Sequence, residues 1–257
     1  MINLYRFIKR LLTKPKNLRE SILVDTNYYG DGLAVWHKNV DFIKDNKFQR
    51  SYKIAINSGH LFSLDNNQLQ VEWRVKIALW AAEHALKLEG DFVECGVNTG
   101  ILSLAICNYF NFNDINKHFY LFDTYKGIPI LRTNNNIEDT QHIDKKNMFY
   151  RDCYEQTKKN FSEWSGVRLV KGIVPDTLET VNIDKVCYLS IDMNVVEPEI
   201  SALRFFWPRL VSGAVILLDD YGWETCEQQK VAFDAFAKEF QVPILFIPTG
   251  QGIIIKP

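Results

Sequence analysis

Phe92-Val93-Glu94-Cys95-Gly96-Val97-Asn98-Thr99-Gly100 is the stretch that decides the fold of this chain. It predicts a buried strand that ends in a glycine turn, and the run Ile101-Leu102-Ser103-Leu104-Ala105-Ile106 that follows predicts a helix. Gly96 and Gly100 let the backbone approach a ligand closely, because glycine has no Cβ and tolerates positive φ. The helix N-terminus adds unpaired N–H groups at the same place. The turn is therefore a candidate binding site for a nucleotide-like ligand.

Glu94 narrows the choice of ligand. Its carboxylate lies two residues before the first glycine, where it would repel a dinucleotide phosphate and attract a cationic amine. S-adenosylmethionine carries such an amine and no phosphate. We therefore take this compound as the candidate cofactor, and we assign its binding within this stretch to Glu94, Gly96, Asn98, Thr99 and Gly100.

Short apolar strands alternate with helices after residue 90. Strands are predicted at 92–95, 119–122, 167–170, 186–191, 214–218, 244–247 and 253–255, and helices near 100–110, 152–163, 198–209 and 225–240. This alternation is typical of a parallel sheet covered on both faces. The last two strands are joined by residues 248–252, too few for a helical crossover, so they must run antiparallel. The predicted fold class is α/β, a doubly wound, mostly parallel seven-stranded sheet with a terminal antiparallel hairpin.

Two domains are expected along the chain. Residues 71–257 form the predicted cofactor-binding domain, and residues 1–70 form a helical N-terminal extension without strong strands. Residues 1–20 carry six basic side chains against one acidic side chain, with apolar residues at helical spacing: Leu4, Phe7, Ile8, Leu11 and Leu12. This segment could lie on an anionic membrane surface. We favour docking on the protein or on a second subunit, which makes a homodimer reasonable.

Composition excludes several classes of protein. The formal net charge of −1 over 257 residues argues against a nucleic-acid binder. The five cysteines are scattered and contain no C-x-x-C pair, which indicates free thiols in a reducing cytoplasm rather than a zinc site. No stretch reaches the roughly 18 apolar residues of a transmembrane helix.

Four of the predicted strands end in carboxylates: Glu94, Asp123, Asp192, and the pair Asp219-Asp220. Ligands of open parallel sheets bind at the carboxyl ends of the strands, and crowded like charges are unfavourable unless a cation binds. Asp123 suits the ribose hydroxyls of a nucleoside. The alternative is that it caps the turn formed by residues 124–127.

Asp192, Asp219 and Asp220 end two strands that are expected to be neighbours. Three carboxylates there suit a hard divalent cation such as Mg²⁺, which could hold an acceptor oxygen and lower its pKa. The alternative is that only one or two of them bind, while the others cap Tyr221-Gly222. Residues 124–150 are long and polar and follow the second strand, so we favour a lid over a disordered insertion.

Residues from about 70 to 257 resemble the macrocin O-methyltransferase family. The matching segments are residues 90–97, Leu121-Phe122-Asp123-Thr124 with Lys126-Gly127, residues 172–178, Leu189-Ser190-Ile191-Asp192, and residues 213–222. The resemblance implies a class I fold, S-adenosylmethionine as donor, a sugar or other small-molecule hydroxyl as acceptor, and Mg²⁺ at Asp192, Asp219 and Asp220. It also implies that Thr124, Gly172, Ile173 and Asp192 contribute to the cofactor site.

One departure from the family pattern concerns the catalytic base. The family often has Asp-x-Asp after the fourth strand, whereas this chain has Asp192-Met193-Asn194. An amide cannot take a proton at neutral pH. The base could be Asp192, a metal-bound hydroxide or His142 of the lid, or the acceptor could need no strong base. The candidate catalytic residues are therefore Asp192, Asn194 and His142.

The predicted function is S-adenosylmethionine-dependent methyl transfer to a hydroxyl of a sugar or related acceptor. One alternative is a nicotinamide-dependent oxidoreductase acting on a nucleotide sugar, against which Glu94 and the missing G-x-G-x-x-G motif speak. Another is a cofactor-binding scaffold that has lost its chemistry, which only Asn194 makes plausible.

Overall fold

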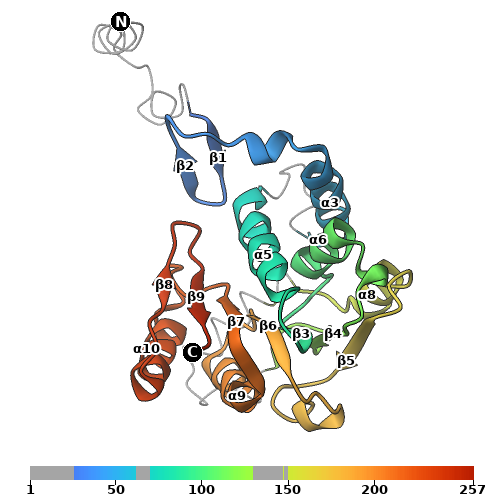
Figure 1. Cartoon of the computed structure of the whole chain (residues 1–257), viewed down its shortest axis with the longest axis vertical. Helices are drawn as coiled ribbons and strands as arrows, with labels where there is room; N and C mark the ends of the chain where they lie inside the picture. The colour runs from blue at the N-terminus through green and yellow to red at the C-terminus, as the bar shows by residue number, and fades with distance from the viewer. Residues whose placement is uncertain (1–25, 62–69, 130–146, 148–149) are drawn as a thin grey trace, which may run out of the picture.

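The computed structural model describes residues 26–61, 70–129, 147 and 150–257. Within these ranges the centre is a seven-stranded sheet in the order β5-β4-β3-β6-β7-β9-β8 (Figure 1). The strands are β3 (Asp91–Cys95), β4 (Phe119–Asp123), β5 (Val167–Lys171), β6 (Val186–Ile191), β7 (Leu210–Leu218), β8 (Leu245–Phe246) and β9 (Gly252–Ile255). Strands β3 to β7 pair in parallel, and β9 is antiparallel to both β7 and β8. The predicted sheet and its terminal hairpin are confirmed.

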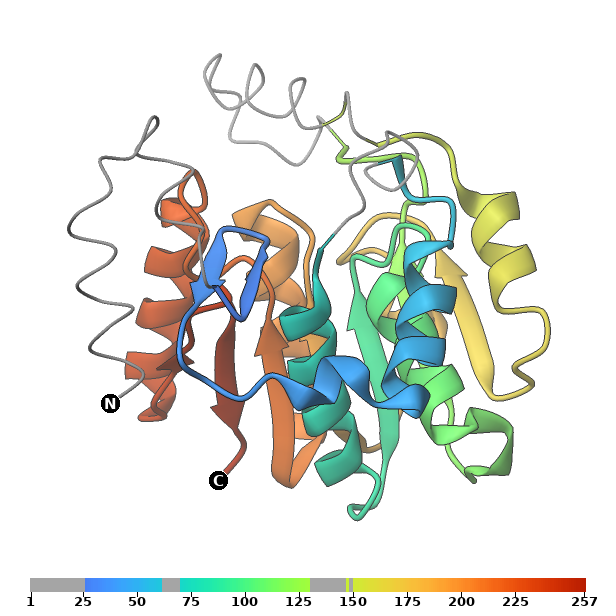
Figure 2. The same cartoon turned by 90° about the horizontal axis from the view of Figure 1, so that it is seen from above.

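Helices cover both faces of this sheet (Figures 1 and 2). On one face α5 (Glu72–Ala85) and α6 (Ile101–Phe110) pack in a core that also includes Phe48 and Ala55 of α3 (Asn46–Ile56). On the other face lie α9 (Val196–Phe206) and α10 (Glu227–Phe240), and α8 (Tyr154–Asn160) precedes β5. All six residues of β6 are buried, as expected for a central strand with helices on both sides.

The strand register brings the functional rim together. Cys95 of β3 pairs with Phe122 of β4 and with Ile191 of β6, and Ile191 pairs with Leu218 of β7. The residues that follow these strands therefore emerge side by side. From β3 the chain adds β4 and β5 on one side of the sheet, and it then continues with β6 and β7 on the other side of β3. The rim at β3 and β6 is therefore also the topological switch point, where open α/β sheets bind ligands.

The N-terminal region differs from the expected helical extension. It contains α3, but also a small antiparallel hairpin of β1 (Tyr28–Gly30) and β2 (Leu33–Val35). Asp31 and Gly32 form its turn with φ of 52° and 72°, and an Asp-Gly pair at positive φ is a strong signal for a two-residue hairpin turn. The prediction missed this signal because strands of three residues carry almost no periodicity.

Two further expectations concern cysteines and membranes. All five cysteines are free, and four of them are buried. None of the helices in the described ranges has both the length and the apolar character needed to cross a bilayer. The cationic segment of residues 1–20, on which the membrane and homodimer hypotheses rest, lies outside the described residues.

Candidate functional site

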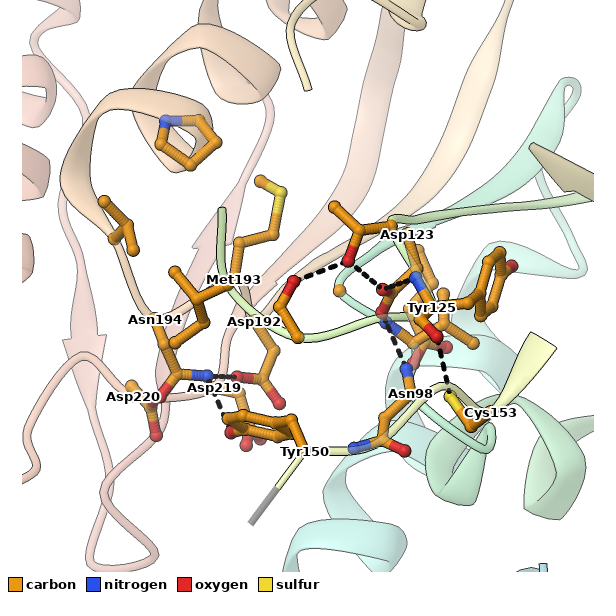
Figure 3. A pocket seen from close by; sticks show the side chains of 18 of the residues that line it. Asn98, Asp123, Tyr125, Tyr150, Cys153, Asp192, Met193, Asn194, Asp219 and Asp220 are labelled. Atoms are coloured by element: carbon orange, nitrogen blue, oxygen red, sulfur yellow. Dashed lines mark hydrogen bonds between the residues drawn. The ribbon is translucent and has the colours of Figure 1, made fainter. Parts of the chain in front are cut away.

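A cavity of about 450 Å³ opens at the carboxyl ends of the strands (Figure 3). Its lining residues form two groups. The glycine turn and the ends of β4 and β5 line one side, including Glu94, Gly96, Val97, Asn98, Asp123, Thr124, Tyr125, Gly172 and Ile173. The other side, which we call the acid end, is lined by Asp31, Arg74, Tyr150, Asp192, Asn194, Asp219, Asp220 and Trp223.

Gly96 is where the chain leaves β3 and crosses the end of β6. Its φ is 90°, and a Cβ at this position would lie 1.8 Å from the carbonyl oxygen of Asp192. The two strand ends are also joined directly, since the Asp192 N–H donates to the Cys95 carbonyl at 2.8 Å. Only glycine can pass at this crossing without moving the backbone. The same residue therefore shapes both sides of the cavity.

The carboxylate of Asp123 braces the glycine turn. Its Oδ2 accepts the backbone N–H groups of Val97 and Asn98 at 2.6 and 2.7 Å. Its Oδ1 accepts the Tyr125 N–H at 2.6 Å and the Thr124 hydroxyl at 3.4 Å. Asp123 therefore caps the turn that follows it, as the alternative interpretation expected, and it also caps the glycine turn after β3. Because both oxygens already accept two donors, a ribose hydroxyl would have to share them.

Glu94 presents a buried carboxyl group to the same side of the cavity. Its side chain is 3% exposed, and Oε2 has no hydrogen-bond partner among the described residues. Burial, reinforced by the charges of Asp219 and Asp123, raises the pKa of this carboxyl to about 8, although a Ser103 hydrogen bond acts against the shift. A buried carboxyl oxygen without a hydrogen-bond partner is costly, so a cationic ligand group that reached Oε2 would be bound strongly.

The other predicted cofactor residues divide into two sets. Thr124, Gly172 and Ile173 line the cavity with Asn98. Thr99 and Gly100 do not line it. The Thr99 hydroxyl instead lies 2.7 Å from the Ser58 hydroxyl, which ties the loop after α3 to the glycine turn. Gly100 is the N-cap residue of α6 in the left-handed conformation.

His60 lies beside Asn98, although no sequence motif predicts it at the site. Its Nε2 is 3.3 Å from the Asn98 side-chain amide nitrogen, and it lines the cavity. Burial lowers the pKa of His60 to about 4, so the imidazole is uncharged at neutral pH. An isolated histidine outside any motif carries no sequence signal for such a position.

The acid end gathers the three carboxylates predicted to hold a metal. Ligand oxygens of Asp192, Asp219 and Asp220 all lie within 4.8 Å of one another. The cause is the register, because the Asp219 N–H donates to the Ile191 carbonyl at 3.0 Å, directly beside Asp192. Burial and the charges of Asp220 and Asp219 raise the pKa of Asp192 well above its ordinary value.

Three carboxylates at this spacing fit a hard divalent cation. Arg74 donates to Asp219 and so brings a positive charge to this cluster. A divalent ion held by these oxygens would favour the ionised form of Asp192, whose pKa is raised by burial and by the charges of Asp220 and Asp219. Oxygen-only ligands of this kind are those that Mg²⁺ prefers.

Arg74 and Gln251 hold Asp219 from both sides. Arg74 Nη1 donates to Asp219 Oδ2 at 2.5 Å, and Gln251 Nε2 donates to Asp219 Oδ1 at 2.8 Å. The guanidinium also lies 4.6 Å from the centre of the Trp223 ring. Burial disfavours the charged form of Arg74, but Asp219 and Asp31 raise its pKa above the ordinary value. No motif marks Arg74, because it lies on a helix far from the rim in sequence.

Asn194 is a hydrogen-bond donor in this geometry. Its side-chain amide donates to Asp192 Oδ1 at 3.1 Å and to the Tyr150 hydroxyl at 3.3 Å. Its backbone φ is 63°, and its N–H donates to Glu199 Oε1 at 2.8 Å. The side chain therefore orients Asp192 rather than taking a proton. His142 lies outside the described residues.

The fold and the two-sided cavity agree with the relationship suggested by the sequence motifs. The sequence model of the macrocin O-methyltransferase (TylF) family matches residues 79–248. The chain belongs to this family.

Two characterised relatives are similar over part of their length. The demethyldecarbamoylnovobiocin O-methyltransferase of Streptomyces niveus is 25% identical over 159 residues, which is 60% of this chain and 60% of that protein. The 8-demethyl-8-(2,3-dimethoxy-alpha-L-rhamnosyl)-tetracenomycin-C 4′-O-methyltransferase of Streptomyces olivaceus is 25% identical over 143 residues, covering 53% and 55%. The chain thus spans less than two thirds of the length of these relatives.

Solved structures share the fold. The O-methyltransferase NovP superimposes with a TM-score of 0.63 at 21% identity, covering 74% of this chain and 83% of that one. A calicheamicin methyltransferase superimposes with a TM-score of 0.55 at 15% identity, covering 95% and 98%. At these identities the similarity concerns the fold, and the chemistry has to be argued from the cavity.

Proposed function

We propose that this protein is an S-adenosylmethionine-dependent O-methyltransferase that acts on a hydroxyl of a sugar or related small molecule with the help of Mg²⁺. The observation that carries the proposal is one cavity with the buried carboxyl group of Glu94 on one side and three clustered carboxylates on the other; Oε2 of Glu94 has no hydrogen-bond partner within the described ranges. Family membership supports the reaction class, and the rhamnosyl group in one relative's name supports the acceptor class.

On the donor side, this chain's residues bind and orient the cofactor. Glu94 offers its unpartnered Oε2 to the donor's amine, and the turn after β3 is held in shape by Asp123. Gly172 and Ile173, at the end of β5, line the remaining wall. Most of the contribution to rate on this side would come from holding the methyl group in line with the acceptor oxygen.

On the acid end, the residues act on the acceptor hydroxyl. A magnesium ion held by Asp192, Asp219 and Asp220 would supply Lewis-acid chemistry that lowers the pKa of that hydroxyl. Asp192, kept in place by the Asn194 amide, is the described residue best placed to receive the proton. Bound S-adenosylmethionine would supply the methyl group: the acceptor oxygen would bond to the methyl carbon as the carbon–sulfur bond breaks, and S-adenosylhomocysteine would leave with an uncharged sulfur.

A transfer assay tests the proposal. The purified protein is incubated with S-adenosylmethionine, Mg²⁺ and a panel of glycosylated natural products and free sugars, and mass spectrometry follows S-adenosylhomocysteine and singly methylated product. At least one acceptor is expected to yield equal amounts of S-adenosylhomocysteine and singly methylated product. Cofactor binding without transfer to any acceptor would favour a silent scaffold, whereas binding of a nicotinamide nucleotide in place of S-adenosylmethionine would favour an oxidoreductase.

A further inference from the structure

Arg74 connects the acid end with the N-terminal hairpin. From the first turn of α5 it donates through Nη1 to Asp219, and through Nε and Nη2 to the two oxygens of Asp31 at 2.6 and 3.1 Å. The side chains of Arg74 and Asp31 are 17% exposed and that of Asp219 is 5% exposed. Both ion pairs are therefore poorly screened by solvent, unlike surface pairs.

Asp31 belongs to the turn of the β1–β2 hairpin, and this turn forms part of the cavity wall. Next to it, a Cβ on Gly32 would lie 3.6 Å from the Trp223 ring, the same ring that packs against the guanidinium. The hairpin has a second attachment at Tyr28, whose hydroxyl donates to Glu72 Oε2 at 2.9 Å. Of these two attachments, the one through Arg74 reaches the acid cluster.

We propose that Arg74 is a positioning residue, an internal counter-cation shared by Asp219 and Asp31 that couples seating of the hairpin to occupancy of the acid cluster by a divalent ion. The proposal rests on the metal assignment made under the proposed function. A divalent charge beside Asp219 repels the guanidinium and weakens its hold on that carboxylate. Arg74 then pairs more strongly with Asp31, and the hairpin is held more firmly against the cavity.

The coupling must be reciprocal. If a divalent ion strengthens the Arg74–Asp31 pair, that pair must strengthen binding of the ion by the same factor. Removing the Asp31 charge leaves Arg74 on Asp219, where it competes with the ion. Removing Arg74 eliminates the competitor, and the hairpin loses its link to the cluster.

The test uses Mn²⁺ as the probe, without cofactor or acceptor. Its dissociation constant is measured by electron paramagnetic resonance of free Mn²⁺, and hydrogen exchange of residues 26–35 is measured with and without the ion. In the unmodified protein, saturating Mn²⁺ should slow exchange of the hairpin amides. Asp31→Asn should weaken Mn²⁺ binding by roughly 5- to 10-fold, the lower part of the usual range of coupling, and should abolish the slowing.

Two variants of Arg74 separate charge from geometry. Arg74→Gln should tighten Mn²⁺ binding by about 5-fold and leave hairpin exchange fast with or without the ion. Arg74→Lys keeps a charge near Asp219 but cannot grip both Asp31 oxygens, so it should restore Mn²⁺ affinity towards the original value without protecting the hairpin. The matched controls, exposed Arg50→Gln on α3 and exposed Asp41→Asn, should change neither measurement.

Three outcomes would overturn the coupling: an Asp31→Asn dissociation constant within twofold of the original, loss of Mn²⁺ binding in Arg74→Gln, or no Mn²⁺ binding in any of the proteins. Titration of S-adenosylhomocysteine into the same samples keeps this result apart from the proposed function. Loss of that binding would count against methyl transfer and leave the Mn²⁺ result standing. Intact binding without the coupling would refute only the role given to Arg74.

Discussion

The two sides of the cavity are built in different ways. The donor side consists of strand ends and one turn, and its principal contacts join residues 25 and 26 positions apart, from Asp123 to Asn98 and Val97. The acid end depends on side chains from distant segments, since Arg74 is 145 residues from Asp219 and 43 residues from Asp31. The donor side is thus set by backbone geometry, and the acid end by balance among buried charges.

Asp219→Asn should separate the two sides most clearly. It removes one carboxylate of the cluster and one of the two carboxylates that Arg74 pairs with, so turnover should fall by about a thousandfold or more, the effect of losing about 4 kcal/mol of transition-state stabilisation. Binding of S-adenosylhomocysteine, measured by calorimetry, should change by no more than a few-fold.

Exposed Asp184→Asn is the matched control for Asp219→Asn and should behave as the unmodified protein. Adding a chelator should lower activity of the unmodified protein to the level of the variant. Full activity of Asp219→Asn in the presence of chelator would contradict any role for a metal.

Gly96→Ala should damage both sides together. The new Cβ would press on the Asp192 carbonyl at a φ of 90°, a conformation that side chains rarely adopt. We expect a loss of about 3 kcal/mol or more in the free energy of unfolding, measured in urea, because backbone on both sides must move. A loss below about 1 kcal/mol would show that the backbone at Gly96 and Asp192 can move apart at little cost.

Glu94→Gln should act on the donor side alone. It removes the charge that attracts the amine, so cofactor binding at pH 8 should weaken by roughly 10- to 100-fold, as expected for a charged hydrogen bond of about 1.5–3 kcal/mol. Exposed Glu89→Gln, which breaks only a surface ion pair with Lys185, is the control. Unchanged binding in Glu94→Gln would remove the observation on which the cofactor assignment depends.

The pH dependence of Glu94 gives an independent check. Its pKa rises from 4.5 when unfolded to about 8 when folded. The folded protein then holds the proton more tightly, so the stability that Glu94 contributes is complete below pH 4.5 and is lost as pH rises towards 8. In the absence of cofactor, Glu94→Gln should lack this decline in urea titrations. Cofactor affinity of the unmodified protein should rise over the same interval, because ionised Glu94 binds the amine.

The sequence predicted the sheet, its terminal hairpin and the carboxylates of its rim, because parallel strands in register place their carboxyl ends together. It predicted less about what those carboxylates touch. Asp123 braces the glycine turn because its side-chain rotamer points back at Val97. Thr99 faces Ser58 because α3 and the loop after it pack against the glycine turn. Arg74, Asp31 and His60 were missed since each reaches the cavity through tertiary packing, which no local pattern records.

Asn194→Asp has the smallest expected effect, and it tests the charge balance of the acid end directly. The amide now donates to Asp192 at 3.1 Å, whereas a carboxylate there would place two negative charges in contact. Without a divalent ion, the variant should be less stable by about 1–2 kcal/mol, the cost of exchanging a hydrogen bond for repulsion. With Mg²⁺ the deficit should shrink or reverse, because the added carboxylate increases attraction for the ion. Equal destabilisation with and without Mg²⁺ would mean that no ion reaches Asp192, and the negative charge of the acid end would then have to be balanced by protein groups such as Arg74.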